Sequence, residues 1–118
     1  MSIAPMTTDE VLAVARLRQW ANDRIKLASA KTSEYQRLGW RERSSRDADA
    51  RLVRVIDFSR ALARLDPEQQ TVLVLYYRDR EEQPRIAAAI GCSTRKVSYL
   101  IPAARQRLAA ELDRLNLL

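Results

Sequence analysis

The chain has 118 residues, 47% of them hydrophobic, and its 21 Lys and Arg residues against 15 Asp and Glu residues leave a net charge of +6. This length fits one domain or a small domain with an extension, and the hydrophobic content excludes a disordered chain. The chain has no histidine, one cysteine (Cys92) and two distant glycines, which excludes a zinc site, histidine-based catalysis and a glycine-rich phosphate loop. We therefore expect a protein that is not an enzyme and holds no metal or cofactor.

The N-terminal residues show no basic and apolar leader pattern, and no apolar run approaches the ~18 residues of a membrane helix. A single cysteine cannot form an intramolecular disulfide, and a chain without disulfides is typical of a reducing compartment. The sequence therefore predicts a cytoplasmic protein that makes no membrane contact.

Helix-forming residues dominate from the start of the chain, and the alternation typical of strands is absent. A first helix is expected to begin at Thr7, Thr8 or Asp9 and to run to about Ser29. Its apolar positions recur every three or four residues: Val11, Val14, Leu17, Ala21, Ile25 and Ala28. This stripe either packs against the rest of the chain or pairs with a second copy, and the sequence leaves both possibilities open.

Residues 30–47 contain Gly39, three serines and few aliphatic residues, which favours a linker with at most one short helix near residues 34–38. Basic residues surround Trp40 in this segment: Arg37, Arg41, Arg43 and Arg46. The segment is either a solvated connector with Trp40 on the core or a nucleic-acid contact through charge and stacking. We divide the chain into residues 1–47, a helix and basic linker, and residues 48–118, a helical domain.

A second helix is expected from Asp47 or Asp49 to about Leu65. Its apolar stripe recurs at helical spacing: Leu52, Val55, Ile56, Ser59, Leu62 and Ala63. A new helix then starts at residues 66–69, which supply an N-cap Asp, a Pro at the first helical position and a Gln that completes a capping box. This third helix continues to Tyr77 and ends in the charged turn of residues 78–82.

The segment from residue 83 to residue 109 has the pattern of a helix-turn-helix. Pro84 suits the first turn of a short helix, Gly91 ends it as a left-handed residue, and Ser93 caps the next helix. That next helix carries one buried face: Val97, Ile101, Ala104 and Leu108. Two helices joined by such a turn predict a helix-turn-helix unit.

Charge is concentrated on the same unit. No acidic residue lies between Gln83 and Ala110, and five basic residues give this stretch a charge of +5: Arg85, Arg95, Lys96, Arg105 and Arg107. Such a concentration of positive charge is the footprint of a protein that contacts phosphates.

The C-terminal half resembles region 4 of bacterial RNA polymerase sigma factors and the sigma-region-4-like regulators of phages and prophages. The resemblance covers about Ser59–Leu112 and needs no gap between Tyr77 and Leu108. The matching positions are Leu65, Pro67, Val72, Leu73, Leu75, Tyr77, Ile86, Ala87, Gly91, Cys92, Ser93, Lys96, Val97, Ala104, Arg105 and Leu108. It implies an all-α fold in which a helical N-terminal body precedes the helix-turn-helix. It also implies a sequence-specific transcription regulator that binds double-stranded DNA as a monomer or homodimer, with RNA polymerase as a candidate partner.

The helix that begins at Thr94 is expected to enter the major groove with its N-terminal end. The candidate DNA-binding residues are Arg85, Thr94, Arg95, Lys96, Ser98, Tyr99 and Arg105. Arg95 is the candidate for a bidentate contact to guanine, and Arg85 is the candidate for a phosphate contact at a helix N-terminus.

Two other functions remain open at this point. The same module occurs in nucleic-acid roles such as a phage packaging subunit or an antitermination factor. A protein-interaction module that has lost DNA binding is the second alternative. It is favoured by Ser98 and Leu100, where sigma region 4 often has basic residues, and by Pro102, which is expected to kink or break the helix.

Overall fold

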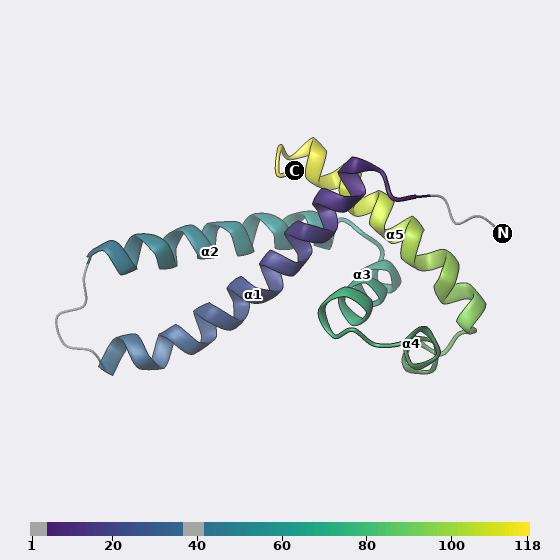
Figure 1. Cartoon of the computed structure of the whole chain (residues 1–118), viewed down its shortest axis with the longest axis horizontal. Coiled ribbons are helices and arrows are strands. Elements are labelled where there is room, and N and C mark those ends of the chain that lie inside the picture. The colour runs from purple at the N-terminus through teal and green to yellow at the C-terminus, as the bar shows by residue number, and fades with distance from the viewer. Residues whose placement is uncertain (1–4, 37–41) are drawn as a thin grey trace.

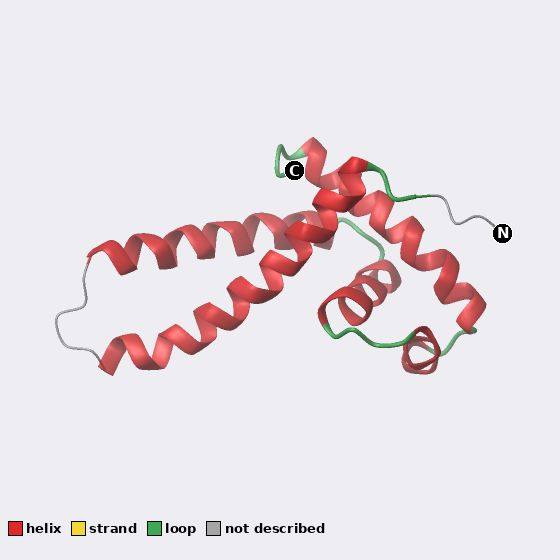
Figure 2. Ribbon diagram, in the orientation of Figure 1, coloured by secondary structure: helices red, strands yellow, loops and turns green. Residues whose placement is uncertain are grey.

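The computed structural model describes the backbone of residues 5–36 and 42–118 and the side chains of residues 5–28 and 49–118. Every regular element in these ranges is helical (Figure 2). The elements are α1 (Thr8–Gln36), α2 (Glu42–Ala63), α3 (Pro67–Leu73), the π-helical turn η1 (Val74–Arg78), α4 (Gln83–Ile90) and α5 (Thr94–Arg114). The predicted all-α fold is confirmed.

Helices α1 and α2 form an antiparallel hairpin that extends away from the remaining helices (Figure 1). The radius of gyration is 16.7 Å, whereas a compact domain of this length would have about 13.5 Å. The prediction of a linker over residues 30–47 is wrong, because the backbone is helical up to Gln36 in α1 and again from Glu42 in α2. Three serines and few aliphatic residues favour a linker in this segment, but propensity is a weak predictor and the described backbone is helical.

The predicted nucleic-acid contact around Trp40 falls outside what the structure describes. Arg37, Trp40 and Arg41 are not among the described residues, and neither are the side chains of Arg43 and Arg46. Both interpretations of this basic segment therefore stay predictions.

The main core joins α1, α2 and the C-terminal half of α5. Its buried side chains are Ala13, Leu17, Trp20, Ala21, Phe58, Ala61, Leu62, Leu65, Leu73, Ala104, Leu108, Ala109 and Leu112. The rings of Trp20 and Phe58 pack with centroids 5.4 Å apart, and Trp20 Nε1 donates a hydrogen bond to Ser59 Oγ at 3.1 Å. The N-terminal helix therefore shares one core with the C-terminal helix, across the boundary proposed at residue 47.

The stripe predicted for α1 is confirmed only in part. Val14, Leu17 and Ala21 are buried, but Val11 and Ile25 are 50% and 63% exposed. The helix instead turns Ala13 and Trp20 inward, because the ring of Trp20 has more apolar surface to bury against Phe58 than either aliphatic side chain. Intramolecular packing, one of the two possibilities, therefore accounts for half of the predicted stripe, and Ala28 is exposed like Val11 and Ile25.

The stripe predicted for α2 is largely wrong. Only Leu62 of that set is fully buried, whereas Leu52, Ile56 and Ala63 are exposed. The helix carries apolar residues on two faces. The face that includes Phe58 packs against α1, because this aromatic ring is larger than the aliphatic side chains of the other face. None of the described residues covers the other apolar face of α2.

A second, smaller core lies between α3, α4 and the N-terminal half of α5. It consists of Val72, Ile86, Ala87, Val97 and Ile101. Tyr77 packs against both cores, because the π-helical turn η1 adds a residue to the end of α3 and turns this ring toward α5. Helix α5 thus contributes its two halves to two different cores.

Candidate nucleic-acid interface

The turn between α4 and α5 has the predicted helix-turn-helix geometry. Gly91 ends α4 in the left-handed conformation with φ of 74°, and its N–H donates to the Ala87 carbonyl at 2.9 Å. Ser93 is the N-cap of α5, and its Oγ accepts a hydrogen bond from Lys96 N at 3.1 Å. The half-buried Cys92 between them packs against the second core. A left-handed glycine followed by a serine cap is what orients the N-terminal end of α5.

The helix α5 runs unbroken from Thr94 to Arg114 with Pro102 inside it. Pro102 therefore does not end the helix, so the expected break is wrong. Val97, Ile101, Ala104 and Leu108 are buried along one side of this helix, as predicted. Leu100, at a position where sigma region 4 often has a basic residue, is half-buried against the second core. The uninterrupted helix keeps its first turns aligned with the turns that are anchored in the main core.

Three predicted contact residues share one open surface at the start of α5. Thr94, Arg95 and Tyr99 are all exposed, and the guanidinium carbon of Arg95 lies 6.0 Å from the centroid of the Tyr99 ring. Ser98 is exposed as well, but its Oγ donates to the carbonyl of Arg95 at 2.6 Å. The side chain of Ser98 is thereby directed to its own helix.

Lys96 and Arg85 flank this surface and form exposed ion pairs. Lys96 Nζ lies 2.9 Å from Glu68 Oε1, and both side chains are about half exposed. This hydrogen bond raises the pKa of Lys96, which is therefore fully charged at neutral pH. Arg85 Nη1 lies 3.8 Å from Glu81 Oε2, with the arginine side chain 79% exposed. Pairs this exposed contribute little to stability, so a phosphate can replace either carboxylate.

Arg105 does not lie with the other candidates. Its side chain is only 13% exposed, and Nε is 3.0 Å from the buried carboxylate of Glu10 at the start of α1. Its Nη1 also donates to Tyr77 Oη at 3.0 Å. An arginine held from two sides in the interior is not available to DNA. The structure therefore contradicts this predicted contact and gives Arg105 a structural role.

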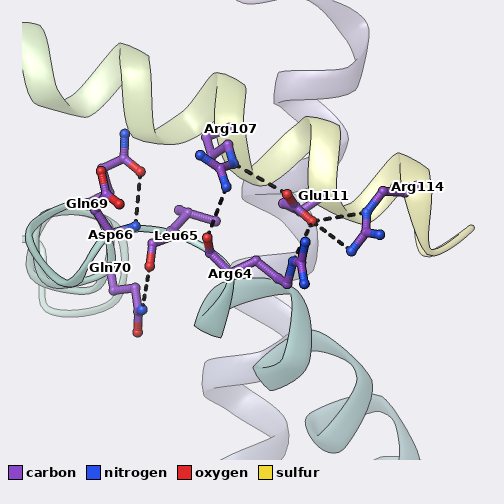
Figure 3. Close-up of polar contacts among 8 residues, drawn as sticks. All are labelled: Arg64, Leu65, Asp66, Gln69, Gln70, Arg107, Glu111 and Arg114. Atoms are coloured by element: carbon purple, nitrogen blue, oxygen red, sulfur yellow. Dashed lines mark hydrogen bonds and ion pairs between the residues drawn. The ribbon is translucent and has the colours of Figure 1, made fainter.

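The last turns of α5 carry a second internal charge cluster, centred on Glu111 (Figure 3). Its carboxylate accepts hydrogen bonds from Arg107 and Arg114 and forms an ion pair with Arg64 at 3.4 Å. Burial alone would raise the pKa of Glu111, but the hydrogen bond from Arg107 and the charges of Arg114 and Arg64 lower it. Arg107 also donates to the Arg64 carbonyl at 3.1 Å and so fixes the corner between α2 and α3.

The basic charge that the sequence places on residues 83–110 is therefore mostly paired. Four of its five basic side chains face a carboxylate: Arg85 with Glu81, Lys96 with Glu68, Arg105 with Glu10 and Arg107 with Glu111. Within the described part of the chain, Arg95 alone among the five has no acidic side chain within ion-pair distance. An i,i+4 spacing in the sequence signals two of these acids, Glu81 for Arg85 and Glu111 for Arg107. No local pattern signals Glu10, which is 95 residues from its partner.

The comparisons with known proteins agree with this geometry. Residues 56–108 match the family model of sigma-70, region 4. This segment, which includes α3, η1, α4 and the first two-thirds of α5, is a sigma region 4-like helix-turn-helix, and the matched family is one of DNA-binding regulatory domains. No curated protein and no solved structure matches the chain.

Within residues 5–36 and 42–118, no helix is long and apolar enough to cross a membrane. The same ranges contain no group of three or more cysteine, aspartate or glutamate side chains placed to hold a metal ion.

Proposed function

We propose that the chain is a DNA-binding transcription regulator whose α4–α5 unit reads double-stranded DNA, without an enzymatic activity. The observation that carries this proposal is the exposed surface of Thr94, Arg95 and Tyr99 at the start of α5, within a segment that matches sigma region 4. An exposed first turn of the second helix is the part of a helix-turn-helix that reaches base edges in the major groove.

The contacts divide into one base contact and two backbone contacts. Arg95 projects from the first turn of α5 and serves as the bidentate donor to a guanine, the pairing that arginine makes most often with a base. Arg85, in the first turn of α4, and Lys96 exchange their exposed carboxylate partners for phosphates. Two phosphate contacts predict that the logarithm of affinity falls with the logarithm of salt concentration with a slope of about −2.

Fluorescence anisotropy of labelled random and genomic duplexes, measured over a range of salt concentrations, tests the proposal. We expect wild type to bind with this slope and an Arg95→Ala, Lys96→Ala double variant to lose binding. The matched control is Arg16→Ala, Lys26→Ala, which removes the same charge from exposed positions of α1. Equal losses in both double variants would mean that binding follows net charge only, and the α4–α5 surface would not be the DNA-binding site.

RNA polymerase is the candidate protein partner, because sigma region 4 is part of that enzyme's promoter recognition. Co-sedimentation of the full chain with core RNA polymerase, with and without promoter-containing DNA, tests this finer proposal. A chain that binds DNA but never co-sediments with the polymerase would be an independent regulator. Packaging and antitermination remain alternatives for such a chain, and ring-shaped oligomers in solution would favour packaging.

A protein-interaction role without DNA binding is a second candidate. The specific observation in its favour is that internal and surface carboxylates face four of the five basic side chains of residues 83–110. It predicts no salt-dependent affinity for any duplex while the protein is fully folded by circular dichroism. The anisotropy experiment therefore also distinguishes the two candidates.

A further inference from the structure

The outward face of α2 carries an apolar stripe that nothing in the described chain covers. Leu52, Val53 and Ile56 are 48%, 57% and 43% exposed. The stripe is bordered by exposed Asp49 on its N-terminal side and exposed Arg60 on its C-terminal side. Three large aliphatic side chains in adjacent turns form a contiguous patch, unlike single exposed hydrophobic residues, which are common on protein surfaces.

The inward face of α2 is already fixed by its contacts with α1. Phe58 packs on Trp20, and Arg54 donates two hydrogen bonds to the buried carboxylate of Asp23, at 3.0 and 3.1 Å. At about 100° per residue, Ile56 lies on the opposite side of the helix from Phe58. The hairpin therefore cannot bury this stripe by rotating α2 without breaking the Arg54–Asp23 pair.

The charges at the ends of the stripe are arranged so that the face is complementary to itself. Along α2 the order is acidic, apolar, basic, at positions 49, 52–56 and 60. When two copies of this helix pack antiparallel about a two-fold axis between residues 53 and 56, Asp49 faces Arg60 of the second copy, and the reverse pair forms by symmetry. Leu52 and Val53 then face Ile56 of the second copy, so the apolar parts also coincide.

We propose that the chain forms a symmetric homodimer in which the outward faces of two α2 helices pack antiparallel. The opposite charges are 11 residues apart in one helix, about 16 Å, which is too far for an ion pair within one chain. Only the second copy can bring them together, and this isologous arrangement is the common one for homodimers. A single helix pair buries less area than a standard protein interface, so the dimer forms at micromolar or higher concentration.

Sedimentation velocity of the full chain, from micromolar to hundreds of micromolar, tests the proposal. We expect wild type to shift from 13.6 kDa toward twice that mass as concentration rises. Ile56→Glu should weaken association by about tenfold or more, because it buries an unpaired carboxylate against Leu52 and Val53 of the second copy. The matched control is Ile25→Glu, an equally apolar and more exposed position on α1 outside the stripe, and it should dimerise like wild type. Unchanged circular dichroism and melting temperature confirm that each variant folds.

A charge exchange gives the sharper test. Asp49→Arg and Arg60→Asp should each dimerise less than wild type, because each places like charges opposite one another in its own homodimer. A mixture of the two variants should associate again, since both pairs in the mixed dimer are then of opposite charge. Wild type that stays monomeric at hundreds of micromolar, or variants that do not associate when mixed, would overturn the proposal. In that case the stripe would have to contact a different protein.

Discussion

The two halves of α5 use the same residue type for opposite purposes. In the N-terminal half, Arg95 lies on an exposed surface beside Tyr99 with no carboxylate at ion-pair distance among the described residues. In the C-terminal half, Arg105 and Arg107 bind Glu10 and Glu111. The first half belongs to the small core of the helix-turn-helix, and the second half belongs to the main core with α1 and α2.

The difference shows that formal charge is a poor measure of the charge a protein can offer to DNA. The acid-free segment of residues 83–110 draws acids from α1, from α3, from the turn before α4 and from its own helix beyond the segment. Exposed partners such as Glu68 compete weakly with phosphate, whereas a buried partner such as Glu10 removes its arginine from the interface altogether. Four substitutions would test whether the N-terminal half of α5 binds DNA while the C-terminal half stabilises the fold.

The largest effect is expected from Arg105→Ala. It leaves the carboxylate of Glu10 buried without its cation, which should lower the free energy of unfolding by about 3 kcal/mol. Urea denaturation followed by circular dichroism measures this loss, and Arg95→Ala serves as the control that should stay within about 0.5 kcal/mol of wild type. A loss below about 1 kcal/mol for Arg105→Ala would mean that this pair does not hold α1 to α5.

Arg95→Ala should show the opposite profile, with stability retained and DNA affinity lost. The expected cost is about 2 kcal/mol, roughly thirtyfold in affinity, and it should be confined to sites with guanine at the contacted position. Anisotropy against a panel of single-base variants of the selected site measures it. An equal loss of affinity on every duplex would mean that Arg95 contacts a phosphate and not a base.

A smaller effect is expected for the acid dependence of folding. The pKa of Glu111 is lowered from its ordinary value of 4.5, so its stabilising ion pairs are complete above that pH and are lost as pH falls through the lower folded value. Glu111→Gln should therefore flatten the decline in unfolding free energy between about pH 5 and pH 2. Part of the decline should remain, because the Thr7 N–H and Arg105 lower the pKa of Glu10 in the same way. A variant that declines as steeply as wild type would contradict this role.

The smallest effect is expected from Glu68→Gln. Lys96 loses its exposed partner in this variant and becomes free to contact phosphate, which should raise DNA affinity by about twofold. Glu82→Gln is the matched control, since it removes the same charge from another exposed position near α4. Equal gains in the two variants would indicate a general change in net charge instead of the release of Lys96.

Local signals in the sequence predicted the helix-turn-helix well. The glycine and serine of the turn, the proline at the start of α4 and the buried face of α5 are encoded within a few residues of where they act. The start of α3 was predicted equally well. Asp66 N donates to Gln69 Oε1 at 3.3 Å, as the predicted capping box requires (Figure 3). Such caps and turns depend on neighbours in sequence, which a single chain displays.

The features that the sequence did not predict are long-range ones. Both faces of α2 are apolar, and the contacts of Phe58 with Trp20 and of Arg54 with Asp23 decide which one is buried. The loss of Arg105 from the interface depends on Glu10, whose position in space no local pattern indicates. The sequence also did not predict the helical backbone of residues 30–36 and 42–47, because its serines and scarce aliphatic residues favour a linker there.

The main core also sets the order in which the chain can fold. It needs Leu17 and Trp20 from α1 and Leu108 and Leu112 from α5, segments separated by most of the chain. During synthesis on a ribosome α2 emerges first and can cover part of the apolar side of α1, whereas the contribution of α5 to this core joins only after α5 has been made. Contacts of such high sequence separation form slowly, because a long loop must close before they stabilise anything. The local core of the helix-turn-helix can form ahead of the closure that joins the two ends of the protein.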